Sequence, residues 1–220
     1  AVLAVMFSTM FVYVHPNEYC IKEVKIGVRR GIQPEVYSAG LYFLMPFGFA
    51  KMHRFPRNVQ VLELTAYPDK ENPSHHNEKA AKIQTSDGFY VDVDVTILYR
   101  IHDPFLVITQ LGTGQLYRTN GILPKAEPFL KQTLGELTTE DFYNSPLRVE
   151  KVRAARDLLN TELQPKGLEV DSVLVRYFSY SDEIQRNIEE KKLQDQLVFK
   201  NQAEAKAAVE SASLKRVTQE

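Results

Sequence analysis

Two aspartates stand two residues apart in the segment Phe89–Tyr99, where Asp92 and Asp94 alternate with valines. Residues i and i+2 of a strand share a face, so the two carboxylates are placed together. A carboxylate pair can supply a general acid and a general base if further groups stand close enough to exchange protons with it. No such partner is evident around this pair, so a solvated or interfacial sheet face is the simpler interpretation.

The other residues that could take part in catalysis or ligand binding also lack suitably placed partners. Cys20 is the only cysteine, which excludes an intrachain disulfide and a cysteine-built zinc site. It has no obvious base beside it and is interpreted as a packed thiol. His75 and His76 are neighbours in the chain, and neighbours in an extended segment point to opposite sides. Gly112–Gly114 lacks the Gly-Lys-Ser/Thr of a phosphate loop, and no His-Glu-x-x-His occurs. The sequence predicts no enzyme activity, no metal and no cofactor.

The nearly equal numbers of basic and acidic residues limit the kinds of partner that we expect. The 220 residues hold 27 Lys and Arg against 28 Asp and Glu, so no global field draws the chain to nucleic acid, which is excluded as a partner. This length allows one large domain or two small ones.

The first fourteen residues, Ala1–Val14, carry no charge. A membrane span needs about 20 apolar residues, so we expect residues 1–16 to be the end of a transmembrane helix that begins earlier. An aromatic residue near the end of a span suits the headgroup layer. A buried core helix and a signal-peptide core are the alternatives, although His15–Glu18 is a poor cleavage site. The candidate membrane contacts in this run are Phe7, Phe11 and Tyr13.

A second apolar run covers Leu41–Phe49 and is interrupted by Pro46 and Gly48. It is too short to span a bilayer. One interpretation is a buried strand followed by a turn. The other is an aromatic hairpin pressed into the bilayer interface, where amphipathic aromatics are favoured. Three cations follow the run and could meet anionic headgroups: Lys51, Arg54 and Arg57. The candidate membrane contacts here are Phe43, Phe47 and Phe49.

The first half of the chain is predicted to be rich in strands. Alternation of valines with polar residues in Phe89–Tyr99 predicts an antiparallel strand with one wet face. Val59–Leu64 and Tyr19–Ile26 are two further expected strands. Pro68–Asn77 is predicted to be a polar loop.

Helix signals begin at Asp103, which can cap a helix that starts with Pro. A capping arrangement at Thr138–Asp141 predicts a short helix, and a longer one is expected from Ser145 to a stop at Gly167. Leu168–Phe178 is rich in β-branched and aromatic residues and is predicted to be a strand. This succession makes an α/β unit.

Residues 181–220 contain neither Gly nor Pro and predict one helix about 60 Å long. Opposite charges recur at i,i+4, and small alanines permit close approach of a second helix without forming a leucine heptad. A solitary solvated helix is the alternative to a helix that pairs. The candidate interface residues are Arg186, Glu190, Lys200, Glu204, Lys206 and Glu210.

The order of these segments resembles the SPFH (band 7) family, which includes stomatin, prohibitin, flotillin and the bacterial pair that accompanies a membrane AAA protease. Four stretches carry the resemblance: the glycine-containing opening through Ser38–Phe47; Thr85–Gly88, continuing through the valine strand to Tyr99–Pro104; Leu137–Asn160 with Lys166–Val170; and Ile184–Lys192. Each motif is weak alone, and the ordered set is specific.

The resemblance implies an α+β SPFH-type fold with a membrane anchor at 1–16, a β-rich membrane-apposed subdomain at 17–87, an α/β subdomain at 88–180, and the start of a long coiled-coil-like helix at 181–220. It also implies a scaffold without catalytic activity. Many copies would form a ring or cage that encloses a patch of membrane lipid, anchored by a single pass in a bacterial inner (plasma) membrane. A paralogous subunit, a membrane AAA protease and a channel are the partners it allows. The alternatives are a monomeric or dimeric adaptor that binds one partner through its helix, and a membrane-bound hydrolase.

Overall fold

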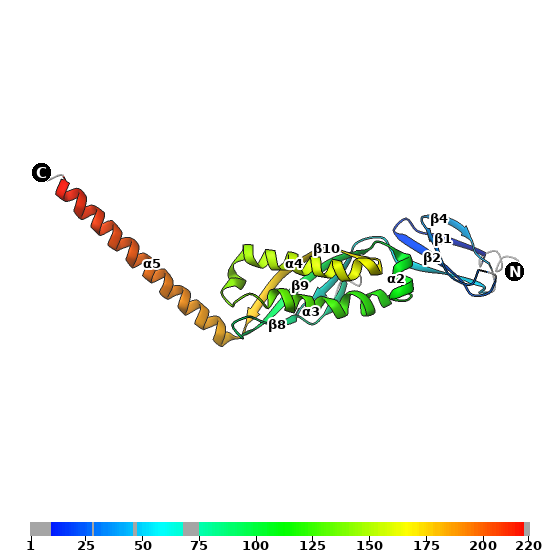
Figure 1. The fold of residues 1–220 in the computed structure, drawn as a ribbon, viewed down its shortest axis with the longest axis horizontal. Helices are drawn as coiled ribbons and strands as arrows, with labels where there is room; N and C mark the ends of the chain where they lie inside the picture. Colours follow the sequence, from blue (N-terminus) through cyan, green and yellow to red (C-terminus); the bar gives the residue numbers. More distant parts are fainter. Residues whose placement is uncertain (1–9, 28, 46–47, 68–74, 218–220) are drawn as a thin grey trace. The chain divides into compact units, whose positions relative to one another are not determined.

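The chain forms two units, residues 1–178 and residues 179–220. The described residues of the first unit form three β-sheets and a group of helices, and those of the second form mostly one long helix (Figure 1). The structure, a computed structural model, describes residues 10–27, 29–45, 48–67 and 75–217.

Residues 11–56 form the two smaller sheets. β1 (Phe11–Val14) pairs antiparallel with β4 (Gly40–Phe43), from Phe11 opposite Phe43 to Val14 opposite Gly40. β2 (Glu18–Val24) lies between β3 (Gly31–Tyr37) and β5 (Ala50–Pro56). The prediction that residues 1–16 end a membrane helix is therefore wrong for 11–14. Residues 1–9 lie outside the described part.

The larger sheet holds β6 (Gln60–Leu64), β7 (His75–Glu78), β8 (Ala81–Gln84), β9 (Tyr90–Ile101) and β10 (Leu168–Tyr180). Its order is β10-β9-β6-β7, and β8 also pairs with β9. Two predictions are corrected here. Residues 75–77 belong to a strand parallel to β6 rather than to a loop. The expected boundary at 87/88 cuts through this sheet, because β6 and β8 pair with β9.

Alternation along β9 builds the core of this sheet. The odd-numbered side chains from Val91 to Ile101 are all buried. On the opposite face Asp92 is exposed, whereas Asp94 and Thr96 are buried. The expected wet face is therefore exposed towards the two ends of the strand, at Asp92 and Arg100, and largely buried between them. Asp94 tolerates burial because its carboxylate accepts hydrogen bonds from Thr65 Oγ1 at 2.7 Å and Ala66 N at 3.2 Å.

Helices occupy the connection between β9 and β10. They are α2 (Pro104–Gln110), the π-helix η1 (Tyr117–Ile122), α3 (Leu123–Leu134), the 3-10 turn η2 (Asp141–Tyr143), α4 (Ser145–Leu163) and the 3-10 turn η3 (Gln164–Lys166). α3 packs against α4 and β8, and Leu130, Leu134 and Leu159 are fully buried.

Three predicted helix signals are confirmed. Asp103 Oδ1 accepts from Phe105 N at 2.9 Å and caps α2. Thr138 and Asp141 form the expected reciprocal arrangement at the entry to η2, with Asp141 N donating to Thr138 Oγ1 at 3.1 Å and Thr138 N donating to Asp141 Oδ2 at 3.1 Å. Gly167 ends η3 at φ +83°, a left-handed conformation that favours glycine.

Tyr117 of η1 connects the smaller sheets to the larger one. Its ring centroid lies 6.4 Å from that of Phe55 in β5 and 6.4 Å from that of Tyr99 in β9. All three side chains are fully buried. Burial raises the pKa of Tyr99, so its hydroxyl stays neutral.

The second unit consists of α5 (Asp182–Val217), which is 36 residues long and begins with Asp182 and Glu183 at the positive end of its dipole. The predicted long helix is confirmed as a helix. Among the described helices, none combines the length and the apolar character that a membrane crossing requires.

Candidate functional site: an apolar and basic face around β1 and β4

The β1–β4 pair exposes large apolar side chains on the side away from its core. Leu41 is 65% exposed and Phe43 is 55% exposed, and Met45 directly after β4 is also exposed. The rings of Phe11 and Phe43 meet edge to face, with centroids 5.9 Å apart. Such a cluster is costly to leave in water, so this surface suits contact with an apolar phase or a partner.

The other side of this region is held in place by a small core. Val14, Cys20, Ile21 and Leu44 are buried, and Leu44 N donates to Met10 O at 2.7 Å. Alternate residues of β4 point to opposite faces, so Leu41 and Phe43 lie together on the exposed side.

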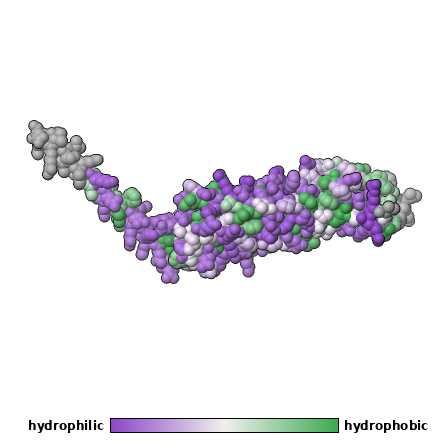
Figure 2. All heavy atoms as spheres, in the orientation of Figure 1, coloured by the Kyte–Doolittle hydropathy of each residue, from purple (hydrophilic) through white to green (hydrophobic). Residues whose placement is uncertain are grey.

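The turn between β2 and β3 continues the apolar surface. Lys25 N donates to Phe49 O at 2.8 Å, so the turn lies beside the loop that follows β4. Ile26 and Phe49 are both exposed there. Four exposed cations accompany them: Lys25, Arg29, Arg30 and Lys51. Figure 2 shows hydrophobic side chains gathered at the end of the first unit that carries β1 and β4.

This mixture suits a lipid surface. Aromatic and aliphatic side chains enter the headgroup boundary, while lysine and arginine meet anionic lipid. We call the exposed apolar residues and these four cations the apolar–basic face: Ile26, Leu41, Phe43, Met45, Phe49, Lys25, Arg29, Arg30 and Lys51.

The predicted membrane contacts fall on this face in part. Tyr13, Phe43 and Phe49 are exposed, and Phe11 is half-buried. Phe7 and Phe47 lie outside the described residues. Whether any of them touches lipid stays a prediction.

The predicted basic residues behave differently from one another. Lys51 is exposed, whereas Arg54 pairs with Glu18 at 3.1 Å and donates to Tyr13 O at 3.2 Å. The Arg57 guanidinium lies 5.5 Å from the centre of the Tyr19 ring. Sequence reasoning missed Ile26, Lys25, Arg29 and Arg30. The signal was present, since glycines at 27 and 31 bracket a basic turn.

The residues weighed for catalysis are not brought together. The Asp94 carboxylate accepts a hydrogen bond from Ala66 N in the loop after β6, and Asp92 is exposed. Cys20 is completely buried, and burial raises the pKa of its thiol, which disfavours the nucleophilic thiolate. Across the described ranges, no three His, Cys, Asp or Glu side chains converge in a way that could hold a metal ion.

The predicted interface residues lie on α5. Arg186, Glu190, Lys200, Glu204 and Lys206 are exposed, and the side chain of Glu210 lies outside the described part. Of the predicted i,i+4 pairs, Lys200 and Glu204 approach to 3.9 Å. Sequence reasoning overlooked four exposed apolar residues of this helix: Leu193, Leu197, Val198 and Phe199. Phe199, at 77% exposed, is the most exposed of the four.

Comparison with known families fits this arrangement. The sequence profile of the SPFH domain / Band 7 family matches residues 12–212, which is nearly the whole chain. The chain belongs to the SPFH domain / Band 7 family. Its mixed α+β fold, with the strand-rich first part, the α/β sheet and the long helix in the expected order, agrees with that membership. No individual curated protein matched the chain.

Proposed function

We propose that this protein is a membrane-bound scaffold without catalytic activity, and that many copies assemble side by side into a ring or cage around a patch of membrane. The enclosed patch would hold partners such as a membrane protease or a channel, and the wall would control which of them meet. Membership of the SPFH family supports a membrane scaffold role.

The apolar–basic face is the observation that carries the membrane part of the proposal. Leu41 and Phe43 are exposed on β4, Met45 is exposed directly after it, and four exposed cations lie in the β2–β3 turn and at the start of β5. Fully burying a large apolar side chain contributes about 1.5–3 kcal/mol, so a few of them give useful affinity for an interface. Anchoring by a single pass through a bacterial inner membrane remains part of the proposal, because residues 1–9 are not described.

The long helix supports the assembly part. Leu193, Leu197 and Phe199 are exposed on α5, where water is an unfavourable neighbour. Copies that share a membrane surface meet at high effective concentration, so packing between their helices costs little additional entropy. The interspersed charges of α5 can then pair between neighbours as well as within one helix. A paralogous subunit could take alternate positions in such a wall.

Particle mass tests the assembly directly. The full chain is extracted in mild detergent and measured by light scattering and electron microscopy, together with the variant Ala203→Pro. Proline inside a helix costs about 3 kcal/mol or more, so the variant should lose the large particle while residues 11–178 stay folded. An unchanged particle would show that α5 is not the assembly element.

The same measurement separates the alternative function. An adaptor that binds one partner through its helix would have the mass of a monomer or dimer in wild-type form. Its exposed Leu193, Leu197 and Phe199 would then be covered by the partner rather than by another copy.

A further inference from the structure

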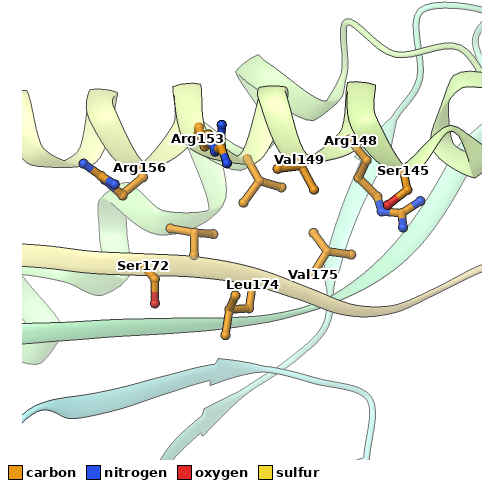
Figure 3. A pocket seen from close by; sticks show the side chains of 10 residues that line it. Ser145, Arg148, Val149, Arg153, Arg156, Ser172, Leu174 and Val175 are labelled. Atoms are coloured by element: carbon orange, nitrogen blue, oxygen red, sulfur yellow. The ribbon is translucent and has the colours of Figure 1, made fainter.

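A groove of about 440 Å³ lies between α4 and β10, away from the apolar–basic face (Figure 3). α4 contributes two valines, Val149 and Val152, and three arginines, Arg148, Arg153 and Arg156. β10 contributes residues 172–175. No carboxylate of the described residues lines the groove, so its walls are apolar and positively charged.

The strand along this groove is an edge strand. β10 is the last strand in the order β10-β9-β6-β7, so within the described chain it has a strand neighbour on one side only. An edge strand offers a row of backbone N–H and C=O groups to an added strand.

Asn160 of α4 shows where this edge begins. Its Nδ2 donates to Val170 O at 2.9 Å, and its Oδ1 accepts from Val170 N at 2.7 Å. The side-chain amide thus takes the place of a neighbouring strand at one residue. The open part of the edge follows directly, at residues 172–175, which are the part of β10 that lines the groove.

The regular alternation of β10 changes at the start of this stretch. Arg100 contacts Asp171 at 3.2 Å, and Arg176 contacts Glu63 at 3.1 Å. Glu63 is opposite Thr96 in the pairing of β6 with β9, and Thr96 and Arg100 lie on the same face of β9. The contact partners of Arg100 and Glu63, Asp171 and Arg176, therefore also lie on one face of the sheet. They are five residues apart, an odd number, and a regular strand would place them on opposite faces. Ser172 and Leu174 point to one side of β10 and Val175 to the other, which is regular alternation, so the bulge-like irregularity lies at Asp171 and Ser172, where the groove begins.

The side chains that follow this irregularity favour an occupant. Figure 3 shows Val175 directed toward α4, while Ser172 and Leu174 point the other way. Arg153 has no ion pair among the described residues, and Arg156 approaches only the exposed neighbour Asp157, at 3.4 Å. The charge of this groove is therefore largely available to a ligand.

Arg148 lines the far end of the groove. The Arg148 guanidinium donates to Phe142 O and lies 5.2 Å from the centre of the Phe178 ring. The opening between this end and Asn160 follows α4 from Ser145 to Arg156. A helix rises about 1.5 Å per residue, which gives about 16 Å, the length of about five extended residues.

We propose that this groove binds an extended segment of a partner protein in which acidic side chains alternate with apolar ones, and that the segment adds to β10 as a further strand. Its backbone would bond to the open edge, its apolar side chains would contact Val149, Val152 and Val175, and its carboxylates would meet the guanidinium groups of Arg153 and Arg156.

A second copy of the chain fits less well. The edge strands β3 and β7 each contain one acidic residue, Glu35 and Glu78, and neither alternates acidic with apolar side chains. Charge complementarity therefore favours a different protein. The inference does not depend on the proposed assembly.

The test uses the full chain in mild detergent and a labelled eight-residue peptide that alternates glutamate and valine. Fluorescence anisotropy should show saturable binding that weakens with salt, and a lysine–valine peptide should not bind. Arg153→Glu combined with Arg156→Glu should weaken binding by about tenfold or more, since two attractions become repulsions. The matched control is Lys79→Glu combined with Lys82→Glu, which makes the same change of charge outside the groove.

Two further measurements address strand addition. Bound peptide should slow hydrogen exchange at the amides of residues 172–175. Of two peptides N-methylated on alternate residues, one should bind and the other should not, because only one row of amides faces β10. Equal binding by the wild type and by the arginine double variant, with thermal melting showing both folded, would overturn the proposal. Protection from hydrogen exchange at residues other than 172–175 would also overturn the proposal. If the arginine double variant changed the particle mass but still bound the peptide, the proposal would likewise fail, and the groove would bind another copy of the chain.

Discussion

Glu23 and His53 face each other across the two strands β2 and β5, with Glu23 Oε2 2.7 Å from His53 Nε2. His53, which is opposite Ile21 in the pairing of β2 with β5, is buried, and Glu23 is half-buried. The hydrogen bond to His53 lowers the pKa of Glu23, with nearby Lys25 and Lys51 acting in the same direction.

Glu23→Gln should reveal this pair through pH. A carboxylate with a lowered folded-state pKa contributes stability in full above its ordinary pKa, and this is lost as the pH falls through the lowered value. The wild type should therefore melt higher than the variant at neutral pH, and the gap should shrink on acidification. Thermal melts over a pH series measure it. Asp92→Asn removes an exposed carboxylate, so the difference in melting temperature between this variant and the wild type should stay small at every pH. A constant gap for Glu23→Gln down to the lowest pH would contradict the assignment.

Phe43→Ser combined with Phe49→Ser should weaken binding of the protein to vesicles that contain anionic lipid. Both rings are exposed, so their loss removes apolar contact with lipid and leaves the core intact. Burial of such side chains is favourable by about 1.5–3 kcal/mol each when complete, so a loss of about tenfold or more is expected. Vesicle sedimentation measures it, with both proteins shortened to begin at Met10. A broadened or lowered melting transition in the double variant would instead identify the two rings as core residues.

Gly167→Ala should destabilise the fold much more than Gly88→Ala. Both glycines have positive φ, at +83° and +89°. A Cβ at Gly167 would come within 2.2 Å of Asp103 O, whereas a Cβ at Gly88 meets nothing within 4 Å. The left-handed conformation alone costs about 1–2 kcal/mol, and the clash at Gly167 adds to it. Urea unfolding of the two variants should separate them clearly. Similar losses would mean that the connection around Gly167 adjusts freely.

Cys20 should be inert in the folded protein. It is completely buried, and burial raises the pKa of its thiol. A thiol reagent at mildly alkaline pH should therefore react only when denaturant is added, and Cys20→Ser should leave particle mass unchanged. Rapid reaction of the native protein would show that the small core opens.

Leu197→Asp combined with Phe199→Asp should reduce the particle to smaller species. Both side chains are exposed on α5, and a charge placed in a helix–helix contact carries a desolvation cost. Gln194→Asp combined with Gln196→Asp adds the same charge at polar positions and should have a weaker effect. Light scattering in mild detergent compares them. Equal behaviour of the two double variants would move the contact away from Leu197 and Phe199.

Local patterns predicted the elements whose cause is local. The valine alternation of β9, the cap at Asp103 and the stop at Gly167 act within a few residues, so they are visible in the sequence. β1 was misjudged for the opposite reason. Four uncharged residues suit a membrane helix or a strand, and the choice depends on pairing with β4, nearly thirty residues later.

The site was predictable to the same degree. The exposed rings of Phe43 and Phe49 belong to an apolar run that is visible in the sequence, so an interfacial hairpin could be proposed from the sequence alone. The cations of the β2–β3 turn required knowledge that Lys25 lies beside Phe49. Burial of Asp94 depended on a tertiary hydrogen bond with Thr65, and the groove beside β10 depended on α4 and on the strand irregularity.

The sheet topology also sets an order of events during synthesis. The strands β2, β3 and β5 are contiguous and complete at Pro56, and β1 and β4 lie within the same stretch. The larger sheet waits for β10, which follows its partner β9 by more than sixty residues. A ribosome adds roughly 5–20 residues each second, so the small sheets leave it several seconds before the larger sheet can close. The surface that we propose for lipid is thus finished first, and under that proposal a nascent chain can bind the bilayer while α5, the helix that we propose for assembly, is still being translated.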